Sequence, residues 1–157
     1  MNIKLISIGK TDDRALDGLI QNYIKRLKHY INFEFVILPD LKNRKNLSIE
    51  QQKVLEGNLL LKNFQKSDFV VVLDEKGLQS SSLGFSKYLA KKMNAGTKQL
   101  VFVIGGPYGF SEAVYQRANQ KMSLSKMTFS HQMVRLFFVE QIYRAFTIIK
   151  NEPYHHF

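Results

Sequence analysis

The chain has 157 residues, of which 45% are apolar and 23% are charged, and 23 lysines and arginines against 13 aspartates and glutamates give a formal charge of +10. We expect one domain spanning residues 1–157, because a chain of this length builds one core, and its apolar content excludes a disordered tail protein. A basic surface gains affinity for nucleic acid by releasing counterions, although simple solubility explains the same charge equally well.

Several classes of protein are excluded by residues that are missing. The chain has no cysteine, so disulfides, thiolate metal sites and cysteine nucleophiles are excluded. Its first nine residues contain only a short apolar stretch, interrupted by Lys4, whereas a signal peptide needs a continuous one. The apolar runs at 69–73 and 100–104 are far below the roughly 20 residues that span a bilayer. We therefore expect a cytoplasmic protein with no membrane segment and no metal site.

The N-terminal part of the chain alternates between strand and helix patterns. Residues 3–8 predict a strand that stops at Gly9, and we expect Thr11 or Asp12 to cap the next helix. Residues 33–38 predict a second strand, and the polar loop at 40–46 is the segment we expect to be most mobile. The intervening helix has one apolar face, formed by Leu16, Leu19, Ile20, Tyr23 and Leu27.

The middle of the chain repeats this alternation. Ser48 and Gln51 form a capping-box pattern that predicts a helix to about residue 64. Residues 69–73 form a continuous apolar run, which is typical of a parallel strand covered on both faces, and 100–104 repeats it. Between them we expect a turn at 74–77 and then a helix, whose inner face is Phe85, Tyr88, Leu89 and Met93.

The C-terminal part predicts a short helix after Ser111, an irregular stretch through 121–130 and a final helix over about 131–150. The final helix is apolar around most of its circumference, so it must be buried on several sides, and a subunit interface is the natural place for its second face. Taken together, the elements predict an α/β domain with a mostly parallel sheet flanked by helices.

Ligands of parallel sheets bind beyond the carboxyl ends of the strands, which places the candidate site at residues 73–77 and 105–110. Three glycines, Gly105, Gly106 and Gly109, follow a buried strand directly. We expect a side chain at Gly105 to occupy the place of a ligand, although glycine-rich turns are often only turns. The spacing matches neither a dinucleotide fingerprint nor a phosphate loop.

Polar residues near these segments have both a chemical and a structural interpretation. Asp74 and Glu75 could be acids or counter-charges, or could form a solvated turn. His131 and Arg135 lie four residues apart at the start of the last helix. A histidine there could exchange protons and an arginine could bind a phosphate, or both could be surface residues.

The chain ends with aromatic and imidazole groups, including Tyr154 and His155. Such groups can stack on an unpaired base and bond its edge, whereas terminal segments usually fray. The adjacent histidines have no third ligand at a matching spacing, so a zinc site is rejected.

Four segments match one family in their order and spacing. They are LDEKG at 73–77 with SSS at 80–82, IGGPYG at 104–109, LSKMTF at 124–129 with His131 and Arg135, and EQIYR at 140–144 with NEPYH at 151–155. Together they resemble the ribosomal RNA large-subunit methyltransferase H family of the SPOUT superfamily, across nearly the whole chain. The resemblance implies a C-terminal deep trefoil knot, S-adenosyl-L-methionine as the cofactor, a homodimer, and ribosomal RNA of the large subunit or assembled ribosome as the partner.

The resemblance also implies which residues form the site. By position, the cofactor contacts of the family fall on Leu73, Gly105, Leu124, Ser125, Lys126, Met127, Thr128 and Phe129. The family methylates N3 of a pseudouridine, so a base or a positive group is needed as the imide proton leaves. We assign substrate or anion binding to Arg135, positioning and proton transfer to His155 with Tyr154, and a similar role to His131. The chain departs from the family pattern at its last two residues.

Three other functions compete with this interpretation. A SPOUT enzyme acting on transfer RNA would usually carry an added RNA-binding domain. A non-enzymatic basic RNA-binding or ribosome-assembly factor would explain the charge but not the glycine loops. A flavodoxin-like protein would bind flavin.

Overall fold

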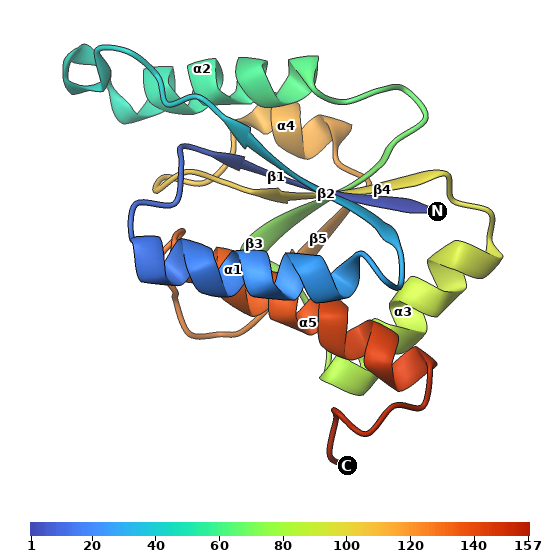
Figure 1. Cartoon of the computed structure of the whole chain (residues 1–157). Coiled ribbons are helices and arrows are strands. Elements are labelled where there is room, and N and C mark those ends of the chain that lie inside the picture. Colours follow the sequence, from blue (N-terminus) through green and yellow to red (C-terminus); the bar gives the residue numbers. More distant parts are fainter.

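Five parallel strands form one sheet in the order β2-β1-β4-β3-β5, in a computed structural model that describes residues 1–157 (Figure 1). The strands are β1 (Asn2–Ile8), β2 (Asn32–Leu38), β3 (Phe69–Gln79), β4 (Gln99–Ile104) and β5 (Gln120–Ser123). Every pairing between neighbours is parallel. The predicted α/β class is therefore confirmed.

Helices cover both faces of the sheet, as Figure 1 shows. One layer contains α1 (Arg14–Leu27), α3 (Ser82–Asn94) and α5 (Met133–Ile149), and the other contains α2 (Ile49–Lys62) and α4 (Glu112–Arg117). The loop before α2 includes a short 3-10 turn, Arg44–Asn46. None of these helices combines the length and the apolar character needed to cross a membrane.

The central strands explain why the apolar runs are continuous. Along β4, Phe102 and Ile104 pack in the cluster shared with α1, α3 and α5, whereas Val101 and Val103 pack in the cluster beneath α2 and α4. Successive side chains of a strand point to opposite faces, so a strand covered on both faces needs an apolar residue at every position.

The helix signals are confirmed with small corrections. The capping box of Ser48 and Gln51 is present, and α2 ends at Lys62. The cap of α1 is Asp13, which accepts from the Leu16 amide, so the expectation of Thr11 or Asp12 was wrong. Leu19 was expected on the inner face but is 49% exposed.

The turn expected at 74–77 is also wrong, because β3 continues to Gln79 through a bulge between Leu73 and Leu78. A Cβ at Gly77 would lie 2.6 Å from the backbone of Met122, so glycine is what allows β3 and β5 to approach here. β5 itself occupies the start of the stretch expected to be irregular. The bulge leaves the Asp74–Lys76 segment beside a cavity rather than in the expected turn.

The last helix packs against both α1 and α3. Phe138, Ile142 and Phe146 are buried there, so most of the apolar surface of the helix is covered within one chain. Met133 and Phe137 remain exposed on its outer side. The subunit interface and the trefoil knot stay predictions.

Candidate functional site

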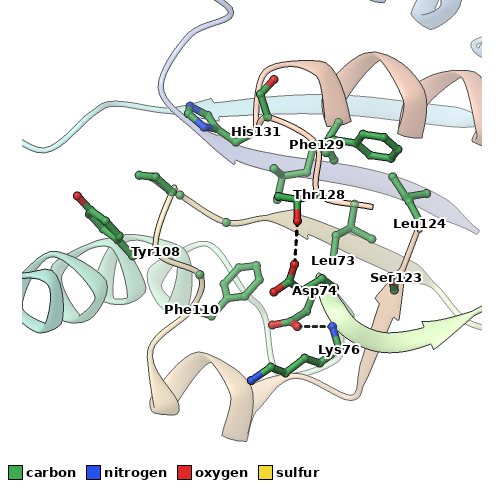
Figure 2. Close-up of a pocket in the computed structure, with 18 of the residues that line it drawn as sticks. Leu73, Asp74, Lys76, Tyr108, Phe110, Ser123, Leu124, Thr128, Phe129 and His131 are labelled. Carbon is green, nitrogen blue, oxygen red and sulfur yellow. Dashed lines mark hydrogen bonds between the residues drawn. The ribbon is translucent and has the colours of Figure 1, made fainter. Parts of the chain in front are cut away.

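A cavity of about 750 Å³ lies at the carboxyl ends of β4 and β5 and beside the bulge of β3. Leu73 of β3, Ile104 of β4 and Ser123 of β5 line it, together with residues 105–110 and most of the segment from 124 to 131 (Figure 2). Its size is within the usual range for small-molecule sites, and its position is the one expected for a parallel sheet.

The segment between β5 and α5 keeps its shape through serine side chains. The Ser123 hydroxyl donates to the Ser125 carbonyl at 2.9 Å, and the Ser125 hydroxyl accepts from the Met127 amide at 2.9 Å. The Ser130 hydroxyl accepts from the Met133 amide at 3.1 Å, where α5 begins. Side chains that satisfy the backbone locally compete with helix and strand formation, which explains the absence of periodicity here.

Most residues expected to contact a cofactor line this one cavity. Only Lys126 does not, and its side chain is exposed. The others come from β3, from the loop after β4 and from the segment after β5: Leu73, Gly105, Leu124, Ser125, Met127, Thr128 and Phe129.

The expected reason for Gly105 needs correction. A Cβ added there would lie 3.0 Å from the Phe110 ring, not in the open cavity. Phe110 is buried, so a larger side chain would disturb the packing of the loop. A side chain at Gly105 would therefore press on the Phe110 ring before it reached a ligand.

Of the residues expected to be catalytic, His131 lines the cavity and Arg135 does not. Arg135 is 0% exposed. Its guanidinium donates to the Ile8 carbonyl at 3.0 Å, to the Thr11 hydroxyl at 3.1 Å and to the His131 carbonyl at 3.3 Å. Burial lowers the pKa of Arg135, while nearby aspartates, Asp12 first, oppose that shift.

A fully buried guanidinium cannot touch RNA, so the expected substrate contact of Arg135 is corrected. The side chain instead joins the end of β1 to the start of α5 and holds the backbone of His131. Arginine stays charged in proteins, which makes these bonds to carbonyl oxygens strong.

Tyr154 and His155 lie at the opposite end of α5. The Tyr154 hydroxyl donates to Glu140 at 3.0 Å, and Arg144 donates to Nδ1 of His155 at 3.2 Å. Burial is the largest of the effects that raise the pKa of Tyr154. Glu140, which Tyr154 contacts, lies nine positions after His131, or roughly 13 Å along the helix axis. Neither Tyr154 nor His155 lines the cavity. One chain therefore does not bring the four candidates together.

Sequence reasoning missed Tyr115 of α4, which also lines the cavity. Its hydroxyl donates to Asp74, and burial followed by this bond raises the pKa of Tyr115 to about 12. The Lys121 ammonium lies 4.4 Å from the ring centroid. A six-residue helix has too little periodicity to identify its inward face, so no signal in the sequence marked this side chain.

Two carboxylates follow Leu73 at the edge of the cavity. Asp74 accepts from the Lys76 amide at 2.8 Å, and Glu75 accepts from the Thr128 hydroxyl at 3.3 Å; both bonds are drawn in Figure 2. Apolar side chains such as Leu73, Leu124 and Val134 line other parts of the cavity. The arrangement can therefore enclose an apolar, planar group beside a cation.

Known proteins resemble the chain over its full length. Residues 1–155 match a family model described as a predicted SPOUT methyltransferase. The ribosomal RNA large subunit methyltransferase H of Christiangramia forsetii is 67% identical over 156 residues, and that of Flavobacterium johnsoniae is 63% identical over 156 residues; each alignment covers 99% of both chains.

A solved structure shares the fold. The crystal structure of a tRNA (m1G37) methyltransferase from Aquifex aeolicus superposes with a TM-score of 0.58 at 14% identity, covering 100% of this chain and 76% of the other. The fold is that of a SPOUT-type methyltransferase. The chain belongs to the ribosomal RNA large-subunit methyltransferase H family within the SPOUT methyltransferases.

Proposed function

We propose that this protein uses S-adenosyl-L-methionine to methylate N3 of a pseudouridine in large-subunit ribosomal RNA on assembled ribosomes. The observation that carries the proposal is the 67% identity, over 99% of both chains, to a relative named for this class of reaction. The formal charge of +10 supports a phosphate-rich partner.

The residues of the cavity fit the cofactor. The adenine ring is flat and presents two apolar faces, which suits Leu73, Leu124 and Val134. The segment from 124 to 129 supplies backbone groups for its polar edge. A carboxylate such as Glu75 suits the positive charges of the methionine portion.

When bound, S-adenosyl-L-methionine supplies an electrophilic methyl group on a sulfonium. Within one chain, His131 is the candidate acceptor of the imide proton, because it is the one histidine that lines the cavity. Tyr108, exposed at the mouth, offers a flat ring on which a base can stack. Figure 2 shows Tyr108 and His131 at the same side of the cavity, above Phe110.

The active form is proposed to be a homodimer. Phe129, Met133 and Phe137 expose apolar surface beside the cavity, and the rings of Phe129 and Phe137 lie 5.1 Å apart. An exposed apolar patch of this kind suits a subunit contact. Because Tyr154 and His155 do not reach the cavity of their own chain, their proposed role in positioning and proton transfer requires a second copy.

Titration calorimetry tests cofactor use directly. The wild-type protein is expected to bind S-adenosyl-L-methionine with micromolar affinity. Val134→Trp, which places a ring in the cavity, should abolish this binding. Val54→Trp is the matched control, since Val54 is exposed on α2, and it should bind as the wild type does. No binding by the wild type would favour a non-enzymatic RNA-binding factor.

The RNA target needs a second measurement. Mass spectrometry of ribosomal RNA from cells lacking the protein should show one missing methyl group on a large-subunit pseudouridine. Unchanged large-subunit RNA, with a methyl group missing from transfer RNA instead, would refute the proposed substrate and favour the competing SPOUT activity.

A further inference from the structure

Glu75 is a carboxylate in the cavity that the fold itself does not use. It follows Leu73 and Asp74 at the start of the β3 bulge and lines the same wall. Its one side-chain hydrogen bond is accepted from the Thr128 hydroxyl at 3.3 Å. No lysine, arginine or histidine nitrogen lies within 4.0 Å of it, although basic residues outnumber acidic ones by 23 to 13.

The neighbouring Asp74 is a useful contrast. One of its oxygens accepts from the Tyr115 hydroxyl and the other from the Lys76 amide. Asp74 therefore joins β3 to α4 and shapes the bulge. Glu75 has no such task, so its negative charge remains available to a ligand.

The position of Glu75 determines what it can meet. Glu75 is exposed at the edge of the cavity, and its carboxylate reaches Thr128 in the segment after β5, so it lies between β3 and that segment. A ligand enclosed between β3 and this segment would pass beside Glu75. The same lining also holds Asp74, Lys53 and Lys76. Neither lysine lies within 4.0 Å of Glu75, so the charge of Glu75 can attract a bound cation.

We propose that Glu75 selects the charged methyl donor over the spent product. This inference rests on the proposed use of S-adenosyl-L-methionine. In the transfer, the C–S bond electrons stay on sulfur while the acceptor nitrogen forms the new C–N bond and gives up its proton. The sulfonium thus becomes a neutral thioether. A carboxylate that attracts the sulfonium loses this attraction after transfer, which favours release of the product.

Titration calorimetry on the full-length protein measures this selection with three ligands. These are S-adenosyl-L-methionine, S-adenosyl-L-homocysteine and sinefungin, which carries an amine in place of the methylsulfonium. Glu75→Gln should weaken binding of the two ligands charged at this position by about three- to fivefold, the scale of one partly solvated charge pair. Binding of S-adenosyl-L-homocysteine should change less than either.

Two control variants separate charge from structure. Glu75→Asp keeps a carboxylate at this position, so the preference for the charged ligands should persist. Glu34→Gln removes one negative charge on β2, the strand at the opposite edge of the sheet from β5, and should leave all three affinities unchanged. Thermal melting checks that each variant is folded.

The outcomes distinguish this inference from the function on which it rests. Equal weakening of all three ligands by Glu75→Gln, or loss of the preference in Glu75→Asp, would overturn the role of Glu75 while leaving cofactor binding established. A wild-type protein that binds none of the ligands would refute the proposed function and this inference together.

Discussion

The two helical layers each bury one charged side chain near the cavity, and they hold it in different ways. In the layer of α1, α3 and α5, Arg135 is 0% exposed and donates to Ile8, Thr11 and His131. In the layer of α2 and α4, Glu56 is 7% exposed and lies beside Gly106. Its carboxylate accepts a hydrogen bond from the side-chain amide of Gln52.

The difference shows that burial of a charge has no fixed consequence for stability. Burial removes water from the Arg135 guanidinium, but three protein oxygens accept its hydrogen bonds instead. Two of these oxygens are backbone carbonyls, which gain a charged donor. Glu56 has one bond from a neutral amide, and burial raises the pKa of its carboxyl more than that bond lowers it. We infer that Arg135 stabilises the fold and that the charged form of Glu56 destabilises it.

The largest effect is expected from Arg135→Met, which keeps the length of the side chain but removes every donor. The Ile8 carbonyl would then lose a charged partner inside the protein, so the free energy of unfolding should fall by about 2–4 kcal/mol. Urea unfolding measures this loss. Arg14→Met, at an exposed position, should change stability by less than about 0.5 kcal/mol. Similar losses in the two variants would break the comparison.

Glu56→Gln should have the opposite sign. Because the pKa of Glu56 is raised by folding, there is a pH range in which the carboxyl is protonated in the folded state and ionised in the unfolded state. This contribution to stability is therefore present below the unfolded pKa and is lost as pH rises through the folded value. At pH 7.5 the variant should be more stable than the wild type, and the gain should vanish near pH 4.

Urea unfolding at the two pH values checks the sign. Glu34→Gln, at an exposed site, is the control and should show no comparable gain at either pH. A loss of stability in Glu56→Gln at pH 7.5 would mean that the carboxylate, like Arg135, is well satisfied where it lies.

The sequence predicted those parts of the fold that local patterns determine. The apolar runs located β3 and β4, and the capping box located α2, because burial on two faces and helix capping leave marks at fixed spacing. β5 (Gln120–Ser123) leaves no such mark, since two of its four residues are polar and exposed. The extension of β3 to Gln79 depends on pairing with β5, which lies more than 40 positions further along the chain.

The site was predicted only in part, because local patterns mark some of its residues and contacts between distant residues determine the others. Strand ends and family resemblance identified Leu73 and the 124–129 segment, and most of these residues do line one cavity. The burial of Arg135 could not be predicted, because the Ile8 carbonyl that fixes it lies 127 positions away. Spacing along a helix shows which residues share a face but not which distant acceptor that face meets.

The smallest effect is expected from a third charged residue, Arg144. Arg144 lies in the same layer as Arg135, but its side chain is 25% exposed and it pairs with Glu140. Partial exposure weakens such a pair, so Arg144→Met should reduce the free energy of unfolding by about 0.5–1 kcal/mol. Because Arg144 also donates to His155, amide exchange should accelerate in residues 151–157 and stay unchanged in β1 and β4. A loss as large as that of Arg135→Met would mean that hydrogen bonding, not depth of burial, determines the contribution of each arginine.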